Sequence, residues 1–271
     1  MKKFFALLIA LLMMATLVAC ANDDDTGNPL ESFDINDNSF SNNEIGSFTY
    51  EASDDGHYEI TGYLSTSAEE HKLEIPSEIE DITVTGIADE AFKSCTSITS
   101  VTIPDTVKYI GDFAFYDCDK LEEVIMPDSV TEIGVGAFRS CDVLKRVELP
   151  SSLTKISDQL FWDCPALTNI ASGEGLTVIG VGAFYNCDAF TGMIIPGSVT
   201  EIQEMAFYGC DNLAVISVPS SVKKVGDTAF SAINAEKVTF TAKKDSYFAT
   251  FFEETYGINT KDYSHYELKT N

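Results

Sequence analysis

The sequence has few basic side chains and few histidines. Among its 271 residues, 17 are Lys or Arg and 43 are Asp or Glu, which gives a net charge of −26. Because nucleic-acid binding depends on Lys and Arg that neutralise phosphates, this balance argues against a nucleic-acid partner. It also argues against electrostatic docking on an anionic membrane. With only three histidines in the chain, the sequence does not predict a His-rich metal enzyme.

Motifs of common enzyme classes are also missing. The sequence contains no GxSxG, no HExxH, no Walker loop and no CxxC, each of which carries a defined chemistry. His57, His71 and His265 all lie outside the repeated part of the chain described below. We therefore expect a protein with no catalytic residues, no cofactor and no metal site. One enzymatic alternative stays open, in which acidic residues without a recognisable motif cut a polymer.

The N-terminal apolar run is too short to cross a membrane. Lys2 and Lys3 precede an uncharged stretch at 4–19 that ends at Cys20, and a spanning helix needs about 20 apolar residues. A positive start and a small-residue end are typical of an export signal. Residues 17–20, Leu-Val-Ala-Cys, resemble the lipobox of bacterial lipoproteins, which implies a signal peptide at 1–20 and lipid on Cys20. A plain signal peptide is the alternative.

Residues 21–47 carry acidic charge and almost no hydrophobic surface to bury. The segment holds seven Asp or Glu residues and no Lys or Arg. Such a composition cannot offset the entropy of ordering the chain. We predict an acidic, disordered tether that holds the rest of the protein away from the membrane.

A 23-residue repeat begins at Ala91. Aromatic, thiol and aliphatic side chains each recur at this interval without a slip, which indicates a repeat array. The phenylalanines are Phe92, Phe115, Phe138, Phe161, Phe184, Phe207 and Phe230; the cysteines are Cys95, Cys118, Cys141, Cys164, Cys187 and Cys210; the aliphatic set is Ile110, Ile133, Ile156, Ile179, Ile202 and Val225.

One unit, residues 114–136, shows what each coil should contain. The pattern Ala-Phe-x-x-Cys-x-x-Leu steps by three, as on one face of a helical turn. Val124 and Met126 then step by two, as in a strand, and Pro127 ends that strand because it cannot donate to a ladder. One unit cannot bury its apolar face alone, so we expect units to stack with their strands paired in parallel.

Both ends of the array carry sequences suited to caps. Residues 48–50 and 58–63 flank Asp55-Gly56, which predicts a hairpin over the first coil. At the other end, residues 247–256 follow Asp245-Ser246 and precede Gly257, which predicts a helix. Its apolar side chains, Phe248, Phe251 and Phe252, would cover the last coil. The predicted domains are therefore an N-terminal cap with one irregular coil at 48–90, a solenoid at 91–242 and a C-terminal cap at 243–271.

The unit AFxxCxxLxxVxIPxSVxxIGxx resembles the BspA-like leucine-rich repeat of bacterial surface proteins. Residues 91–111 carry the whole pattern, and the match covers about residues 73–242. The resemblance implies an α+β solenoid, a right-handed superhelical stack of 23-residue coils that forms an arc with a parallel β-sheet, an N-terminal hairpin cap and a C-terminal helical cap. It also implies export to the cell surface and a role in adhesion to host matrix proteins or other cells.

The six in-phase cysteines have three interpretations. Exported proteins often form disulfides, and thiolates also bind metals when they converge on one ion. Each cysteine here replaces an apolar side chain in a stacked column, so we expect buried free thiols that act as small hydrophobes.

Two rows of side chains are candidate ligand-binding positions. The first points outward from the predicted strands, and the alternative is an ordinary solvated sheet; its residues include Glu123, Ile125, Arg146, Glu148, Ile194 and Val215. The second follows each repeated Phe and offers aromatic contact area to protein or sugar; its aromatic residues are Tyr116, Trp162, Tyr185 and Tyr208. The alternative for the second row is that its rings lean over neighbouring coils.

A third row follows the repeated cysteines. Aligned carboxylates can hold Ca²⁺, although Asp in such turns more often accepts backbone hydrogen bonds. Its acidic residues are Asp119, Asp142, Asp188 and Asp211.

Together these features predict a non-catalytic, lipid-anchored protein on the extracellular face of a bacterial cell membrane. Its solenoid would bind a macromolecular partner, a protein or glycan on a host or neighbouring cell, and the lipid would be its only link to the membrane. The alternative is a glycan-binding accessory lipoprotein of a carbohydrate-uptake system. An aromatic strip favours the alternative, and a broad mixed strand face favours the first hypothesis.

Overall fold

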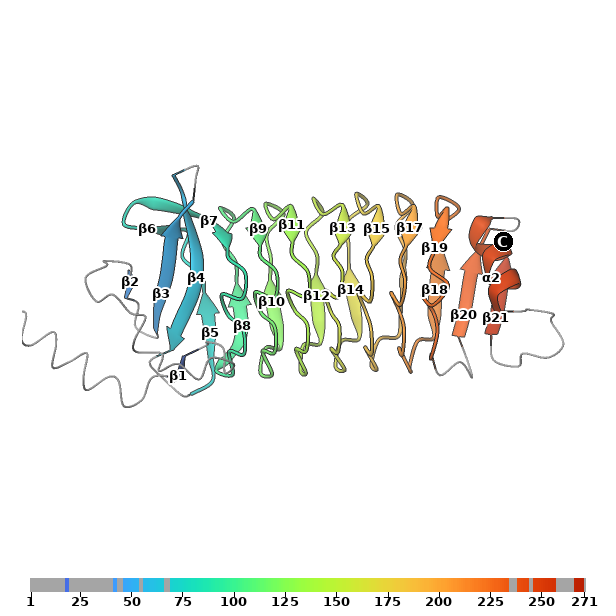
Figure 1. Cartoon of the computed structure of the whole chain (residues 1–271), viewed down its shortest axis with the longest axis horizontal. Coiled ribbons are helices and arrows are strands. Elements are labelled where there is room, and N and C mark those ends of the chain that lie inside the picture. The colour runs from blue at the N-terminus through green and yellow to red at the C-terminus, as the bar shows by residue number, and fades with distance from the viewer. Residues whose placement is uncertain are drawn as a thin grey trace, which may run out of the picture.

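The protein is an elongated stack of coils (Figure 1). The structure, a computed structural model, describes residues 18–19, 41–42, 46–53, 56–65, 69–233, 238–243, 246–256 and 266–270. Most of the predicted signal peptide and tether, including Cys20, lies outside these residues. Two short N-terminal strands are β1 (Val18–Ala19), which pairs with β4 (Tyr58–Ser65), and β2 (Ser41–Asn42).

One long side of the stack is a parallel sheet, here called the front sheet. Its strands repeat in register at 23-residue steps, so that Val101, Val124 and Val147 lie side by side, buried beneath the sheet. The ladder has two sections. The first contains β5 (His71–Glu74), β8 (Ile98–Thr102), β10 (Glu123–Ile125), β12 (Arg146–Glu148) and β14 (Asn169–Ala171), and the second contains β16 (Gly192–Ile194), β18 (Val215–Val218), β20 (Val238–Ala242) and β21 (Tyr266–Thr270).

A second parallel sheet, here called the back sheet, was not predicted. It contains β7 (Ile82–Ile87), β9 (Tyr109–Ile110) and β11 (Glu132–Ile133), then β13 (Lys155–Ile156), β15 (Val178–Ile179), β17 (Glu201–Ile202) and β19 (Lys224–Val225). In the repeats each back strand is two residues long and buries one aliphatic side chain, such as Ile133. A two-residue strand is too short to show alternating apolar and polar residues. The sequence therefore indicated a buried aliphatic side chain at this position but not a strand.

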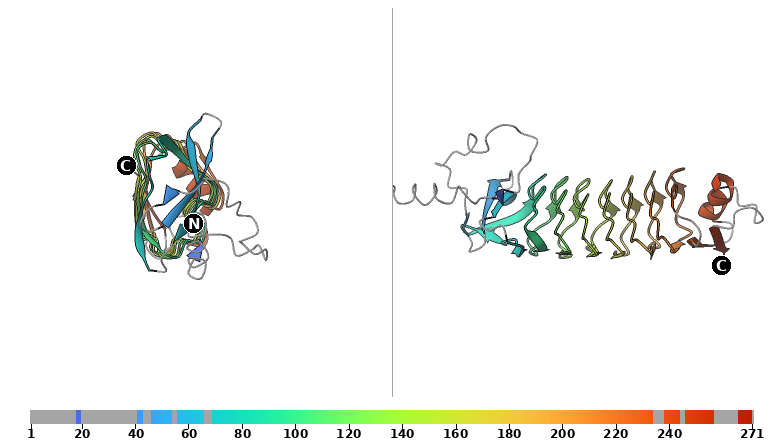
Figure 2. Two further views of the ribbon diagram at one scale, coloured as in Figure 1. Left: turned by 90° about the vertical axis from the view of Figure 1, so that its left-hand side faces the viewer. Right: turned by 90° about the horizontal axis from the view of Figure 1, so that it is seen from below.

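The stack runs almost straight in the side views of Figures 1 and 2, and not in the implied arc. Solenoids bend when one side of each coil is thicker than the other. Here each coil contributes one strand to each of two parallel ladders, and neighbouring parallel strands lie about 4.8 Å apart whatever their sequence. Both ladders therefore advance by the same distance from coil to coil.

The third side of each coil is a turn, and the predicted helical turn is wrong. Two residues in each unit have positive φ, as Phe113 (54°) and Asp117 (61°) do in one coil, whereas an α-helix needs φ near −63°. The backbone forms short turns, in which the Tyr116 amide donates to the Phe113 carbonyl at 3.0 Å, and it also bonds from coil to coil, as the Phe92 amide does to the Ala114 carbonyl at 2.7 Å.

The predicted phenylalanine column is confirmed as the centre of the core. Successive rings lie 4.9–6.0 Å apart between centroids and within 21° of parallel. All seven rings are fully buried. Each ring therefore packs on the coil before and the coil after, which explains why a single unit has no independent core.

Five of the six repeated cysteines are buried free thiols, as expected. Their thiols do more than fill space, because each donates a hydrogen bond to the carbonyl of a repeated Phe at 3.0–3.2 Å, as Cys164 does to Phe138. Burial raises the pKa of Cys118, Cys164 and Cys210 to about 12. The expectation is wrong for Cys95, which is disulfide-bonded.

The N-terminal cap is the predicted antiparallel hairpin of β3 (Gly46–Ala52) and β4. Phe48 packs on Tyr63 with ring centroids 5.2 Å apart, and Tyr63 in turn lies 6.2 Å from Phe92. The short strand β6 (Glu78–Ile79) pairs with β7 beside it. The hairpin thus extends the aromatic column beyond its first repeat.

The C-terminal cap contains the predicted helix, α2 (Tyr247–Tyr256). Ser246 caps it by accepting the Ala249 amide at 3.3 Å. Phe248 lies 5.9 Å from Phe230, and Phe252 lies 4.5 Å from Phe240, between ring centroids. Strand β21, which follows the helix and pairs with β20, was not predicted.

Candidate functional site

The outward side of the front sheet presents two columns of side chains. Because side chains alternate along a strand, residues flanking each buried Val point away from the core. The first column reads Lys72, Ser100, Glu123, Arg146 and Asn169, and the second reads Glu74, Thr102, Ile125, Glu148 and Ala171. Four predicted ligand-binding residues, Glu123, Ile125, Arg146 and Glu148, are adjacent on this face.

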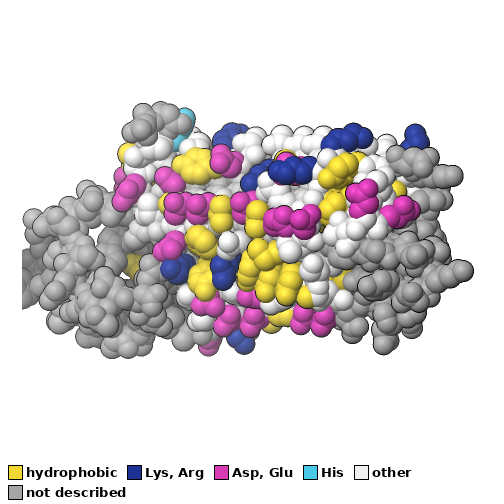
Figure 3. Space-filling model, turned by 45° about the vertical axis from the view of Figure 1, so that its right-hand side comes forward, with side chains coloured by type: hydrophobic (Ala, Val, Ile, Leu, Met, Phe, Trp, Pro, Cys, Tyr) yellow, Lys and Arg dark blue, Asp and Glu magenta, His cyan; other side chains and the backbone are white. Residues whose placement is uncertain are grey.

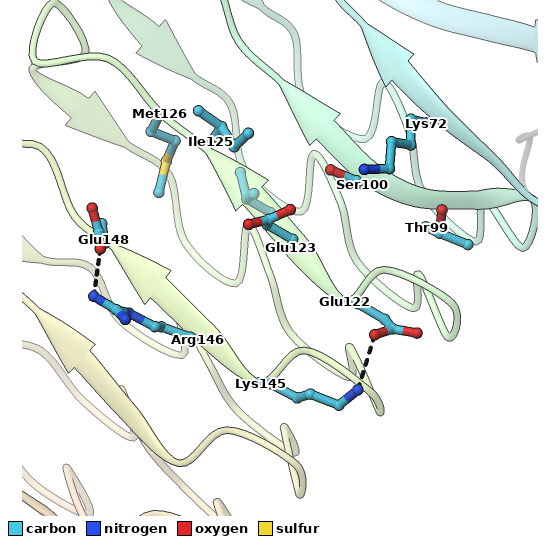
Figure 4. A pocket seen from close by; sticks show the side chains of 11 residues that line it. Lys72, Thr99, Ser100, Glu122, Glu123, Ile125, Met126, Lys145, Arg146 and Glu148 are labelled. Atoms are coloured by element: carbon cyan, nitrogen blue, oxygen red, sulfur yellow. Dashed lines mark hydrogen bonds and ion pairs between the residues drawn. The ribbon is translucent and has the colours of Figure 1, made fainter.

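A groove of about 680 Å³ lies over the first section of the front sheet. Figure 4 shows side chains from β8, β10 and β12 and Lys72 of β5 around it. Its floor is low over β8, because Thr99 and Ser100 are short and Ser100 is only 6% exposed. Lys72 of β5 lines one end of the groove, and longer side chains of the β10 and β12 coils line the rest. The groove therefore results from one coil with short side chains between coils with long ones.

Most charged groups of the groove pair with one another. Lys145 lies 2.9 Å from Glu122 on the neighbouring coil, and Arg146 pairs with Glu148 on its own strand. The Lys145 hydrogen bond holds the pKa of Glu122 below its usual value. Lys72 and Glu123 make no ion pair with any described residue.

The predicted residues Ile194 and Val215 lie in the second section of the front sheet. Ile194 is 82% exposed and Val215 is 50% exposed. They occupy β16 and β18, and neither lines the groove. The ladder is interrupted between β14 and β16, which separates this apolar part of the face from the charged groove.

The aromatic row forms a ladder of stacked rings on the turn side. Trp162 lies 3.7 Å from Tyr185, and Tyr185 lies 4.9 Å from Tyr208, between ring centroids. The Arg139 guanidinium lies over the Trp162 and Tyr116 rings at 5.2 and 5.9 Å. Figure 3 shows one face of the stack, on which hydrophobic side chains gather in patches beside rows of acidic side chains.

Ring stacking occupies the faces that a sugar would need. Carbohydrate binding by an aromatic side chain uses an open ring face, and both faces of Tyr185 are covered by its neighbours. Trp162 likewise lies between Arg139 and Tyr185. The groove includes none of the four predicted aromatic residues, so the ten candidates form separate sets and not one site.

The aspartates that follow the cysteines form an acidic edge. Partial desolvation, and then the carboxylates of Asp211 and Asp163, raise the pKa of Asp188. The pKa of Asp119 is raised in the same way, with Asp117 and Asp142 as its acidic neighbours. No group of three or more His, Cys, Asp or Glu in the described part of the chain is arranged to hold a metal ion.

Backbone-binding carboxylates lie at a different repeat position, which the sequence did not reveal. Asp89 accepts the Asp112 amide at 2.7 Å, and Asp112 accepts the Val135 amide at 2.6 Å. The position is acidic in only some coils, so it has no conspicuous period. The hydroxyls of Ser129, Ser152 and Ser198 each donate a hydrogen bond to a backbone carbonyl of the preceding coil. Ser221 is the exception, because its buried hydroxyl has no partner in the described residues.

Among curated proteins, no relative matches the chain. Similar solved structures include a leucine-rich cell surface protein of Faecalibacterium prausnitzii (23% identity, 74% of this chain and 75% of that one, TM-score 0.43). A leucine-rich repeat protein of T. pallidum is 24% identical over 81% of this chain and 96% of its own, with a TM-score of 0.47. A leucine-rich repeat protein from Bacteroides capillosus is 31% identical over 49% of this chain and 98% of its own, with a TM-score of 0.42.

The repeat itself matches a family model. Six copies of the BspA type leucine-rich repeat region cover residues 65–191 and 177–266, and no catalytic family is indicated. Within the described residues, no helix has both the length and the apolar character to cross a lipid bilayer. The repeat match extends over most of the chain and coincides with the stacked coils of the structure: the chain belongs to the BspA type leucine-rich repeat family.

Proposed function

We propose that this chain binds a protein partner through the outward side of its front sheet. The observation that carries the proposal is the exposure of Ile194, Val215 and Ile125 on that side, because none of them contributes to the core. Exposed apolar side chains beside a groove with charged sides are typical of surfaces that meet another protein. Membership of a leucine-rich repeat family supports the same function.

Substitution on the front sheet tests this proposal. Ile194→Glu combined with Val215→Glu should abolish retention of surface proteins from neighbouring cells, or of matrix proteins, on the immobilised chain. The control is Thr154→Glu, an exposed position beside β13 on the back sheet, which should leave retention unchanged. Equal retention by the front-sheet variant and the unmodified chain would refute the proposal.

Lipid anchoring through Cys20 is part of the same proposal. The export-signal pattern at 1–20 supports it, and the acidic composition of 21–47 fits a spacer between membrane and solenoid. A chain anchored in this way on the cell surface would act in adhesion. Cys20→Ser should release the protein from membranes, whereas Ser39→Ala in the predicted tether should not. Continued membrane association of Cys20→Ser would exclude the lipid anchor.

A further inference from the structure

Two opposite charges in the groove have no ion-pair partner among the residues that the structure describes. Lys72 on β5 and Glu123 on β10 are both exposed, and neither forms an ion pair with a described residue. The other charged side chains that line the groove pair among themselves, as Lys145 does with Glu122. The charges of Lys72 and Glu123 therefore remain available to a binding partner.

The register of the sheet fixes the separation of the backbone positions that carry these two charges. Lys72 lies opposite Ser100, and Ser100 lies opposite Glu123. Two strand spacings separate their backbones, which is about 10 Å. Ser100 between them is almost buried, and Lys72, Ser100 and Glu123 all line the groove, with the Lys72 side chain extending toward Ser100 (Figure 4).

An exposed aliphatic side chain, Ile125, lies beside Glu123 in the groove. Ile125 is two residues after Glu123 on the same strand, so both side chains point outward, and Ile125 is 49% exposed. Met126 also lines the groove and packs partly against the core. Any partner that covers Glu123 therefore also meets an aliphatic surface.

We propose that the groove binds an extended protein segment that carries a basic and an acidic side chain three residues apart, with an aliphatic side chain next to the basic one. The basic group would lie over Glu123, the acidic group over Lys72 and the aliphatic group against Ile125. This inference rests on the proposed function and specifies its partner.

Three physical arguments support this choice of ligand. A partner that covers both charges must compensate them, because an unpaired buried charge is costly. A polyanion does not meet this requirement, since it would face Glu123 and a chain of net charge −26. In a polyproline II segment, residues i and i+3 share a face and are about 9.3 Å apart, which matches the two strand spacings between Lys72 and Glu123.

Selection from a library of displayed random linear peptides tests the inference with the purified full chain. The unmodified chain should enrich peptides with an acidic and a basic residue three positions apart and a neighbouring aliphatic residue. With Glu123→Lys, the enriched basic position should become acidic, and peptides selected on the unmodified chain should bind about tenfold more weakly or worse. Lys72→Glu should invert the acidic position in the same way.

Glu132→Lys on the back sheet is the matched control, because Glu132 is an exposed strand residue without an ion pair among the described residues. It should leave the enriched sequences unchanged. Identical enrichment by Glu123→Lys and the unmodified chain, or no enrichment over bare support, would overturn this inference. The retention experiment with Ile194→Glu and Val215→Glu would still decide the proposed function separately.

Discussion

At the scale of single residues, the repeated Phe is the main link between coils. Seven Phe residues at a constant 23-residue interval were sufficient to predict this column from the sequence. Side chains that recur once per coil stack on one another, and stacking buries them. The positive φ of Phe113 was not predictable, since Phe does not favour that conformation. At the position of Asp117 the signal was present and was missed, because Asp, Asn or Gly, which favour positive φ, recurs there at Asp117, Asp163, Asn186 and Gly209. The hydrogen bonds of the thiols were missed because Cys also fits a purely apolar role.

Removing one ring from the column should destabilise the whole solenoid. Phe138→Ala leaves a cavity between two neighbouring rings, and we expect a loss of about 3–5 kcal/mol in the free energy of unfolding, measured by urea denaturation. Ile194→Ala, which truncates an exposed side chain, should change that free energy by no more than about 0.5 kcal/mol. A loss below about 1 kcal/mol for Phe138→Ala would contradict a stacked core.

Thiol reactivity tests both the burial of the free cysteines and the disulfide at Cys95. The native protein should react slowly with a thiol reagent, because the free thiols are buried and the pKa of Cys118, for example, is about 12. After denaturation without reductant, a disulfide at Cys95 predicts five reactive thiols. Six or more reactive thiols would contradict the disulfide at Cys95. Rapid reaction of the native protein would contradict the buried column.

The acidic edge should make stability depend on pH through Asp188. A carboxyl group with a raised pKa binds more protons in the folded than in the unfolded state, so its contribution to stability falls as pH rises through the folded pKa. Asp188→Asn should therefore raise the urea midpoint at pH 7, and this gain should disappear below the unfolded pKa of about 3.8. Asp105→Asn, at an exposed turn, is the control; an equal gain there would contradict the explanation.

At the scale of elements, the front strands, the hairpin and the C-terminal helix were predictable, and the back strands and β21 were not. The front strands have alternating apolar residues and an ending Pro, as at Val124, Met126 and Pro127. The helix has a Ser cap and three spaced phenylalanines. The back strands are too short to alternate, and their pairing depends on the neighbouring coils.

Gly192 should be essential where the second section of the front sheet begins. It has φ +140°, and an added Cβ would lie 1.8 Å from the Val215 carbonyl oxygen. Gly192→Ala should therefore lower the free energy of unfolding by more than about 1 kcal/mol, as measured by chemical denaturation. Gly197→Ala is the matched control, because no atom lies within 4 Å of its added Cβ. Equal stability of the two variants would show that β16 and β18 lie farther apart than in this structure.

At the scale of the whole molecule, the sequence predicted a stack of coils but not its straightness. An arc requires two sides of unequal thickness, and the second ladder, with strands such as Glu132–Ile133, became evident only in the structure. The groove was equally hidden, because it depends on which side chains of different coils are adjacent. Glu123 and Ile125 were identified from alternation, whereas Lys72 was not, since it lies before the regular repeat.

Backbone hydrogen exchange of the chain, with and without a protein captured in the retention experiment, tests the central claim most directly. If the front sheet is the binding surface, exchange should slow in β8, β10 and β12 or in β16 and β18, and should stay unchanged in β11, β13 and β17 of the back sheet. Slowing confined to the back sheet, with the front strands unaffected, would contradict the account.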